Sequence, residues 1–241
     1  GMEKAAAFLE THRYAAYLGA SLGFTKMEGT TVNAKDKIVY SALQNIQSSM
    51  VAGNAANVPG NGISVPKQLV AGAVMALNLK GGQKDTAGGT INSEWMPVDT
   101  KVLLAGEDIT ADALGNTANP NNIANPDNLK FSEKMRTLFI GEDSSQHVNN
   151  FLWAYNVDTK QLSRVMSIPS GGESTGLHAV DEINGWTYIM SNFQHAGDWG
   201  AIHSVVKDTL DPMIKANYKN NNGAAVGYLT AAAKQPSLNQ A

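Results

Sequence analysis

Short runs of alternating hydrophobic and polar residues extend along most of this chain, and this pattern predicts strands rather than helices. Clusters of glycine, asparagine, aspartate and proline separate the runs and are typical of turns. The strong predicted strands cover residues 37–43, 73–79, 101–104, 136–141, 150–156, 162–168 and 187–191, and weaker ones cover 29–33, 129–132, 176–180 and 227–229. Residues 3–20 are instead rich in alanine, and their apolar positions predict one amphipathic helix that ends near Gly19 and Gly23.

The predicted strands form a loose internal repeat. Three times, a polar or glycine-bearing segment leads into a short strand, a turn and a strong strand, and these segments begin at Met27, Pro126 and Glu173. In the first two units, two further strands follow before the next unit starts. Four antiparallel strands in about forty residues match one blade of a β-propeller.

The repeat predicts a mainly β fold: a partial β-propeller of about three four-stranded blades with an N-terminal helix. Residues 1–24 form the helical lead-in, 25–230 the propeller-like domain and 231–241 a flexible tail. A propeller usually needs at least four blades, and three alone leave sheet faces bare. We therefore expect either a homodimer that completes the ring or a piece of a longer protein.

Composition and charge narrow the functional classes. Hydrophobic residues make up 43% of the 241 positions, enough for a sizeable core. A net charge of −3 does not provide the basic surface that nucleic-acid binding needs, and no apolar run is long enough to span a membrane. There is no cysteine, which excludes thiolate nucleophiles and cysteine-ligated metals. The glycine-rich residues 171–176 open a strand rather than a helix, which argues against a P-loop.

Acidic residues at the start of each unit are the main candidates for a site. Glu28, Asp127 and Glu173 occupy equivalent places, and such segments converge at one end of a propeller's central channel. Three carboxylates around one axis repel one another unless a cation holds them, and their oxygens suit hard ions such as calcium or ferric iron. The alternative is that each carboxylate caps a turn and faces solvent.

Two further candidates directly follow strong strands. Asp143 is a candidate oxygen ligand, or else a turn residue that binds local backbone. His195 is a candidate for binding a metal or, when protonated, a phosphate-like anion of the substrate, and the alternative is a structural histidine. The tryptophans are interpreted as packing residues rather than as a ligand cage: Trp95, Trp153, Trp186 and Trp199.

The three units also resemble segments of the PhoX-type bacterial alkaline phosphatase family. Residues 26–33, KMEGTTVN, are similar to its Arg-Met-Glu-Gly segment, and residues 125–129, NPDNL, to its Pro-Asp-Asn segment. Residues 172–198 resemble its Glu-x-Thr-Gly segment, which closes in Gln-His-Pro-Gly. The order and spacing of these motifs agree over roughly residues 10–200.

The resemblance implies a six-bladed propeller with a calcium and iron (Ca²⁺ and Fe³⁺) site on its axis, acting on small phosphate monoesters. It implies that Glu28 and Glu173 are metal ligands, joined by Asp127 and Asp143. Metal ions neutralise and orient a phosphate, and carboxylates are suitable hard ligands for them. A periplasmic or secreted parent protein is also implied.

The sequence departs from the family in ways that keep other functions open. The family's iron site uses a cysteine from an earlier part of the chain, and none is present here. Lys26 replaces the usual arginine, and Ala196 replaces the usual proline. The hypotheses are a metal-dependent phosphatase or a fragment of one, an inactive propeller that serves as a binding or assembly module, and a calcium-dependent propeller lactonase.

Overall fold

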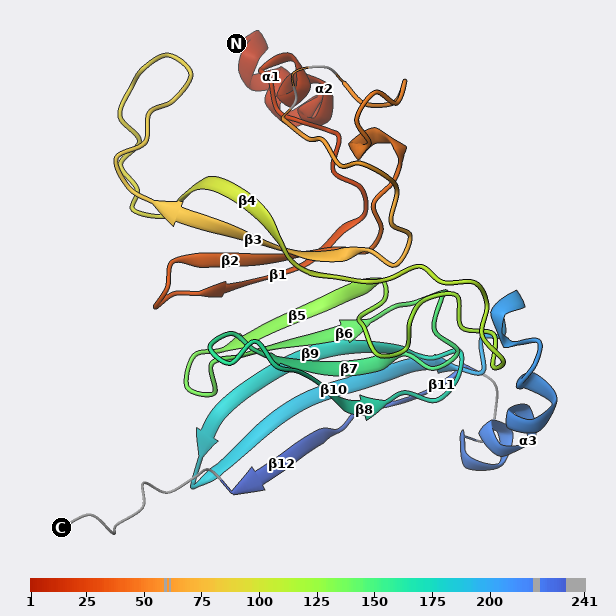
Figure 1. The fold of residues 1–241 in the computed structure, drawn as a ribbon. Coiled ribbons are helices and arrows are strands. Elements are labelled where there is room, and N and C mark those ends of the chain that lie inside the picture. Colours follow the sequence, from red (N-terminus) through yellow and green to blue (C-terminus); the bar gives the residue numbers. More distant parts are fainter. Residues whose placement is uncertain (59, 61, 219–221, 233–241) are drawn as a thin grey trace.

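A computed structural model describes residues 1–58, 60, 62–218 and 222–232 (Figure 1). Within these residues the protein is mainly β, with three four-stranded antiparallel sheets. The first sheet runs in the order β1 (Met27–Asn33), β2 (Ile38–Leu43), β3 (Ala73–Lys80) and β4 (Met96–Ala105). The second runs in the order β5 (Pro126–Ser132), β6 (Thr137–Glu142), β7 (Phe151–Asn156) and β8 (Leu162–Ser167).

The third sheet is built around β10 (Trp186–Ala196). Along one edge β10 pairs with β9 (Glu173–Ile183), and along the other it pairs with β11 (Gly223–Ala225) and β12 (Tyr228–Ala232). Every strand expected from the hydrophobic pattern is therefore present, and β11 is an addition. The expected tail from residue 231 begins inside β12, and residues 233–241 lie outside the described part of the chain.

The prediction of a single N-terminal helix over residues 3–20 is wrong. The chain forms α1 (Met2–Leu9) and α2 (Thr11–Tyr17), which are separated at Glu10, where φ is −132°. Neither helix buries a residue. Helices this short gain little stability from helix propensity alone. Because they are not packed against other elements over a buried face, nothing holds the two segments in one continuous helix.

The remaining helical segments are short and lie between or after the strands. They are η1 (Ser48–Met50), η2 (Ala201–His203) and α3 (Lys207–Tyr218). No helix among the described residues is long and apolar enough to cross a membrane.

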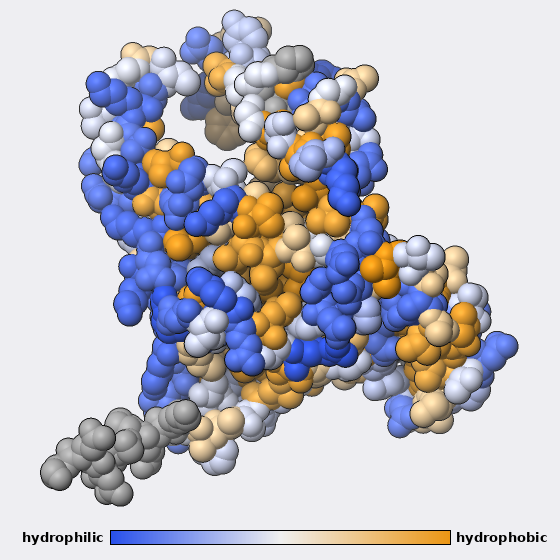
Figure 2. Space-filling view, viewed as in Figure 1, coloured by the Kyte–Doolittle hydropathy of each residue, from blue (hydrophilic) through white to orange (hydrophobic). Residues whose placement is uncertain are grey.

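The three sheets stack face to face, and the contact between them is concentrated at their first strands. β1 lies against β5, and β5 lies against β9. The main core forms between the first and second sheets. Its fully buried members include Tyr40 and Val74 from the first sheet and Leu138, Ile140 and Trp153 from the second. Apolar side chains also reach the surface in the middle of the face shown in Figure 2.

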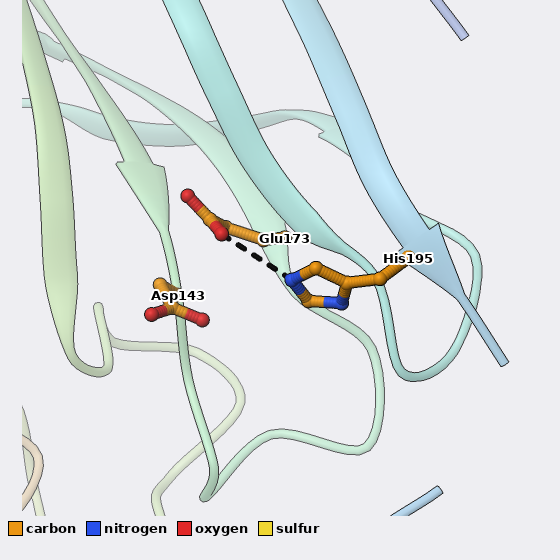
Figure 3. Close-up of side chains that lie close together, drawn as sticks. All are labelled: Asp143, Glu173 and His195. Carbon is orange, nitrogen blue, oxygen red and sulfur yellow. Dashed lines mark hydrogen bonds and ion pairs between the residues drawn. The ribbon is translucent and has the colours of Figure 1, made fainter. Parts of the chain in front are cut away.

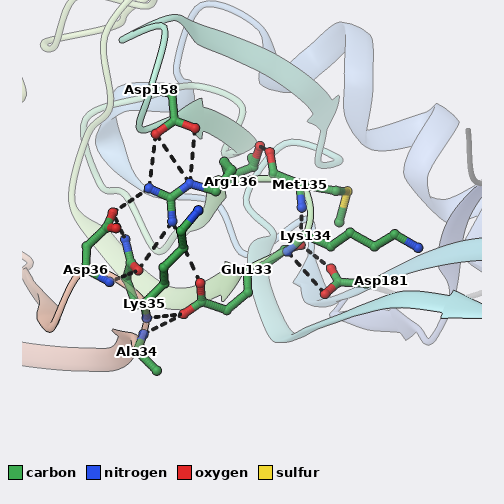
Figure 4. Close-up of polar contacts among 12 residues, drawn as sticks. Ala34, Lys35, Asp36, Glu133, Lys134, Met135, Arg136, Asp158 and Asp181 are labelled. Atoms are coloured by element: carbon green, nitrogen blue, oxygen red, sulfur yellow. Dashed lines mark hydrogen bonds and ion pairs between the residues drawn. The ribbon is translucent and has the colours of Figure 1, made fainter. Parts of the chain in front are cut away.

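A polar network ties the first hairpin of the first sheet to the second sheet, and that of the second sheet to the third (Figure 4). Glu133, in the second sheet's turn, accepts hydrogen bonds from the backbone N–H groups of Ala34 and Lys35 in the first sheet's turn. Asp181 of the third sheet in turn accepts hydrogen bonds from the backbone N–H of Lys134 in the second sheet's turn and from the hydroxyl of Ser132 at the end of β5. This network holds one end of the stack and leaves the other end, where the first strands begin, free for a site.

Candidate metal centre

Three carboxylates begin the first strands at the end of the stack away from the hairpin turns. These first-strand carboxylates are Glu28 on β1, Asp127 on β5 and Glu173 on β9. Glycine allows strands of neighbouring sheets to approach closely at this end of the stack. A Cβ atom added to Gly29 would lie 2.4 Å from the carbonyl oxygen of Asp127, and one added to Gly141 would lie 2.8 Å from that of Ser174.

The chain turns into the three first strands in the same way. The residue two positions before each first-strand carboxylate has a positive φ, a conformation that is uncommon for residues other than glycine. The angles are 46° at Lys26, 45° at Asn125 and 75° at Gly171. The repeat that the sequence suggests therefore has a backbone counterpart at the candidate site.

Three side chains from two sheets meet there. One ligand atom each from Asp143, Glu173 and His195 lies within 4.8 Å of the others (Figure 3). Two ligands on opposite sides of an ion, each about 2.1 Å from it, lie about 4.2 Å apart. Small side-chain rotations would therefore bring all three atoms to bonding distance of one ion.

The histidine is oriented by a backbone carbonyl. His195 Nδ1 donates a hydrogen bond to the carbonyl oxygen of Gly171 over 2.9 Å, and its Nε2 faces Glu173 Oε2 at 3.3 Å. A proton held on Nδ1 leaves Nε2 available as a ligand atom, as in many metal sites. The φ of His195 is 44°, in the left-handed region, and it turns the ring toward the carboxylate of Glu173 at the end of β10.

The two carboxylates are held by glutamine side chains. Gln194 Nε2 donates to Glu173 Oε2, and the two residues are paired across β9 and β10. Gln44 Nε2 donates to Asp143 Oδ2 over 3.1 Å, from the end of β2 in the first sheet. Hydrogen bonds of this kind fix the direction of ligating carboxylates.

Asp127 has a strongly perturbed acidity. Burial raises its pKa from 3.8 to about 6, with further contributions from the negative charges of Glu28, Glu173 and Asp143, while Lys26 opposes the shift. The first-strand carboxylates and Asp143 therefore act on one another electrostatically. A cluster that raises the pKa of its own members in this way favours a cation.

The acidities of two of the three converging groups are also shifted. Burial, followed by the charge of Glu173, raises the pKa of Asp143, although the hydrogen bond from Gln44 opposes the change. Burial lowers the pKa of His195, but the hydrogen bonds to Gly171 and Glu173 outweigh it, so the net pKa lies above the ordinary value. A nearby cation would reverse the shift at Asp143 and favour its charged form.

A cavity of about 330 Å³ opens beside the three side chains. Asp143 and His195 form part of its wall, so a molecule in the cavity would reach an ion held between them. The polar groups that complete the wall come from the segment after β6 and from the segment around η2, and include Ser144, Ser145, Asn150, Asp198 and His203.

The chain matches no family model, no curated protein and no solved structure. The case for a metal centre therefore rests on the residues themselves.

Of the five residues singled out from the sequence, Asp143, Glu173 and His195 come together. The other two lie beside this group but outside it. Glu28 forms an ion pair of 3.0 Å with Lys26, and Asp127 is coupled to the group through charge. His195, expected to contact an anionic substrate or a metal, lies among the candidate metal ligands.

Sequence reasoning missed the residues that orient this group. Gln194 is adjacent to His195 and opposite Glu173 in the register, so strand pairing was a signal for it. Gln44 is 99 residues away from Asp143 and carries no local signal. His203, which lines the cavity, lies in a segment where no clear pattern exists.

We expect Asp127→Asn to stabilise the metal-free protein at neutral pH. The raised pKa means that the folded state binds the proton of Asp127 more tightly than the unfolded state does, so stability falls as pH rises from 3.8 to about 6. A neutral amide avoids this loss. Because the side chain is only half-buried, solvent screening limits the gain to about 1 kcal/mol.

Thermal unfolding in the presence of a chelator checks this expectation. The variant should melt at a higher temperature than the wild type at about pH 7.5, and the difference should vanish at about pH 4. If the variant and the wild type melt at the same temperature at both pH values, the raised pKa of Asp127 is contradicted.

Proposed function

We propose that this protein binds a transition-metal ion through Asp143, Glu173 and His195 and uses it to hydrolyse phosphate monoesters. The observation that carries the proposal is the convergence of these three ligand atoms at the wall of a polar cavity. Two carboxylates and an imidazole suit iron, manganese or zinc. Calcium prefers oxygen ligands alone, so it would suit Glu28 and Asp127 better than the group that contains His195.

The phosphatase proposal combines this donor set with the resemblance to the PhoX-type family. A bound ion supplies Lewis acidity and charge neutralisation to a phosphoryl group. The protein's own residues hold the ligands in position: Gln44 and Gln194 fix the two carboxylates, and the Gly171 carbonyl fixes the imidazole. Ser145 is exposed at the cavity wall and offers its hydroxyl to phosphate oxygens.

The arrangement of the sheets supports an incomplete β-propeller. Each of the first two sheets is a four-stranded meander, and in all three sheets the first strand lies next to the first strand of its neighbour. In a propeller the first strands line the central channel, and functional groups gather at one end of it. The first-strand carboxylates occupy such a position.

Hydrolysis of p-nitrophenyl phosphate tests the function. We expect activity after the protein is loaded with iron, manganese or zinc, and loss of that activity with a chelator. Asp143→Asn should lower kcat/KM at least 100-fold, because it removes a charged ligand. Glu182→Gln is a matched control, since Glu182 is an exposed carboxylate at the far turn of the third sheet and should leave kcat/KM unchanged.

The outcomes separate the hypotheses. Activity that survives both the chelator and Asp143→Asn would contradict a metal-dependent mechanism. Metal binding without hydrolysis would refute the phosphatase and leave a metal-binding module.

A further inference from the structure

We propose that Asn150 is a positioning residue of the metal centre. Its buried amide fixes the distance between the segment that carries Asp143 and the segment that leads into Glu173. The proposal rests on the metal binding proposed above and deepens it, because it names the group that sets the spacing of the ligands. It does not depend on the hydrolysis of phosphate esters.

The three candidate ligands come from two different sheets (Figure 3). Strand pairing fixes Glu173 relative to His195, because Gln194, the residue before His195, is paired with Glu173 across β9 and β10. Asp143 instead follows β6 of the second sheet. Among the described strands β6 pairs only with β5 and β7, so a contact other than strand pairing must set the distance from Asp143 to the other two ligands.

The amide of Asn150 makes this contact. Asn150 directly precedes β7 and is 5% exposed. Its Oδ1 accepts a hydrogen bond from the backbone N–H of Ser144 over 2.9 Å, and its Nδ2 donates to the carbonyl oxygen of Gly172 over 2.6 Å. Ser144 follows Asp143 in the chain, and Gly172 precedes Glu173. One planar group therefore joins the backbones beside two candidate ligands.

The same link reaches the histidine. The carbonyl oxygen of Gly171, the residue before Gly172, accepts the hydrogen bond from His195 Nδ1. Gly172 itself sits in a tight turn, since its backbone N–H donates to the carbonyl oxygen of Pro169 over 2.9 Å. A shift of Gly172 would therefore move both Glu173 and the carbonyl group that orients His195.

The other end of the link is fixed from the first sheet. Ser144 Oγ donates to Asn125 Oδ1 over 2.7 Å, and Asn125 Nδ2 donates to the carbonyl oxygen of Gln44 over 2.8 Å. The side chain of Gln44 in turn donates to Asp143. All of these residues except Asp143 are buried, as is Asn150. Connected buried hydrogen bonds make a structure rigid, and Asn150 extends this rigid chain to the third sheet.

The spacing of the ligands matters because one ion must reach all of them. The ligand atoms of Asp143, Glu173 and His195 lie within 4.8 Å of one another. A site of this kind works only when its supporting groups hold it to within about 0.5 Å. Asn150 is not one of the three ligands, so it acts through Asp143 and Glu173. Loss of a supporting group behind the ligands typically lowers metal affinity about 10- to 100-fold.

A cobalt(II) titration of the chelator-stripped protein tests the positioning role. The visible absorption of bound cobalt is followed, because it reports the geometry of the ligands. Asn150→Leu keeps a side chain branched at the same atom and removes both hydrogen bonds. We expect its Kd for cobalt to rise about 10- to 100-fold and its absorption bands to differ from those of the wild type.

Asn150→Ala is the second variant. It removes the same hydrogen bonds without placing an apolar group beside Ser144 and Gly172, and Asn150 lines the cavity, so solvent can reach the two freed groups. This variant should fold more readily than Asn150→Leu. Its cobalt affinity and its absorption bands should change in the same direction.

Asn116→Leu is the matched control. Asn116 is 6% exposed, close to the value for Asn150. Its Nδ2 donates to Asp112 Oδ2 and its Oδ1 accepts from the backbone N–H of Val148, both over 2.8 Å. Neither Asp112 nor Val148 is next to a candidate ligand in the sequence. We therefore expect Asn116→Leu to lower the urea midpoint about as much as Asn150→Leu does, but to bind cobalt like the wild type.

The outcomes separate positioning from stability. Wild-type cobalt affinity and absorption bands in both Asn150 variants would overturn the proposal. An equal loss of affinity in Asn116→Leu would also overturn it, because the effect would then follow from stability alone. The titration uses no phosphate ester, so a failed phosphatase assay leaves its result intact. A wild type that binds no cobalt would instead refute the metal centre, and the positioning role with it.

Discussion

Replacing Glu142 with glutamine should destabilise the protein by about 3 kcal/mol or more. Glu142 is fully buried at the end of β6, and both of its oxygens accept two hydrogen bonds. Oε1 accepts from the backbone N–H of Ala124 at 2.9 Å and from Trp153 Nε1 at 2.6 Å. Oε2 accepts from the backbone N–H of Phe151 at 2.9 Å and contacts His147 Nδ1 at 3.0 Å.

Glutamine has the size of this space, but it cannot accept all the hydrogen bonds that Glu142 accepts. Its amide nitrogen would face donor groups, and the negative charge beside His147 would be lost. Both ring nitrogens of His147 lie near oxygen acceptors, Glu142 Oε2 and the carbonyl of Asn119. Buried N–H donors left without an acceptor are costly, and this is the main source of the expected loss.

Urea unfolding of Glu142→Gln, His147→Gln and the double variant measures this effect. The double variant should lose less than the sum of the two single losses, because the residues act as a pair. Glu133→Gln, a change at a 40% exposed side chain, should cost under about 1 kcal/mol. A loss for Glu142→Gln as small as that of this control would contradict the role of Glu142 as a buried anchor.

Replacing Asn125 with alanine should cost about 3–5 kcal/mol. Asn125 is 4% exposed and has a φ of 45° directly before β5. Its Nδ2 donates to the carbonyl oxygens of Gln44 and Val70 at 2.8 and 2.7 Å, and its Oδ1 accepts from Ser144 Oγ at 2.7 Å. Alanine leaves these groups unpaired and also strains the left-handed backbone.

Asn125→Gly separates the two causes. Glycine accepts the backbone angle but makes none of the side-chain hydrogen bonds, so it should be about 1 kcal/mol more stable than Asn125→Ala and still less stable than the wild type. Denaturant unfolding of the three proteins gives the comparison. If alanine and glycine variants both unfold like the wild type, the amide of Asn125 does not join the two sheets.

The strands were predictable because they depend on local alternation and on turn residues. β2, β6 and β7 each combine branched or aromatic residues with clear turn signals on either side. The helix break at Glu10 was not predictable, because nothing in the composition of residues 3–20 interrupts the helical pattern there. Neither segment buries a residue, so packing does not hold the two in one continuous helix.

The part of the candidate site that lies within the internal repeat was predictable from the sequence. Equivalent positions in three units placed the first-strand carboxylates at one end of the stack. The buried pair of Glu142 and His147 was not predictable, because its partners at Asn119 and Ala124 lie in a long loop without a pattern. Trp186 was interpreted as a packing residue, and its exposure reflects the uncovered face of the third sheet.

Metal content per chain tests the central claim most directly. The protein is stripped with a chelator, dialysed against iron, manganese, zinc and calcium salts together, washed and subjected to elemental analysis. We expect about one transition-metal ion per chain in the wild type and in Glu182→Gln, and less than about a tenth of that in Glu173→Gln. A wild type without a bound ion, or a Glu173→Gln variant that retains as much metal as the wild type, would contradict a metal centre at Asp143, Glu173 and His195.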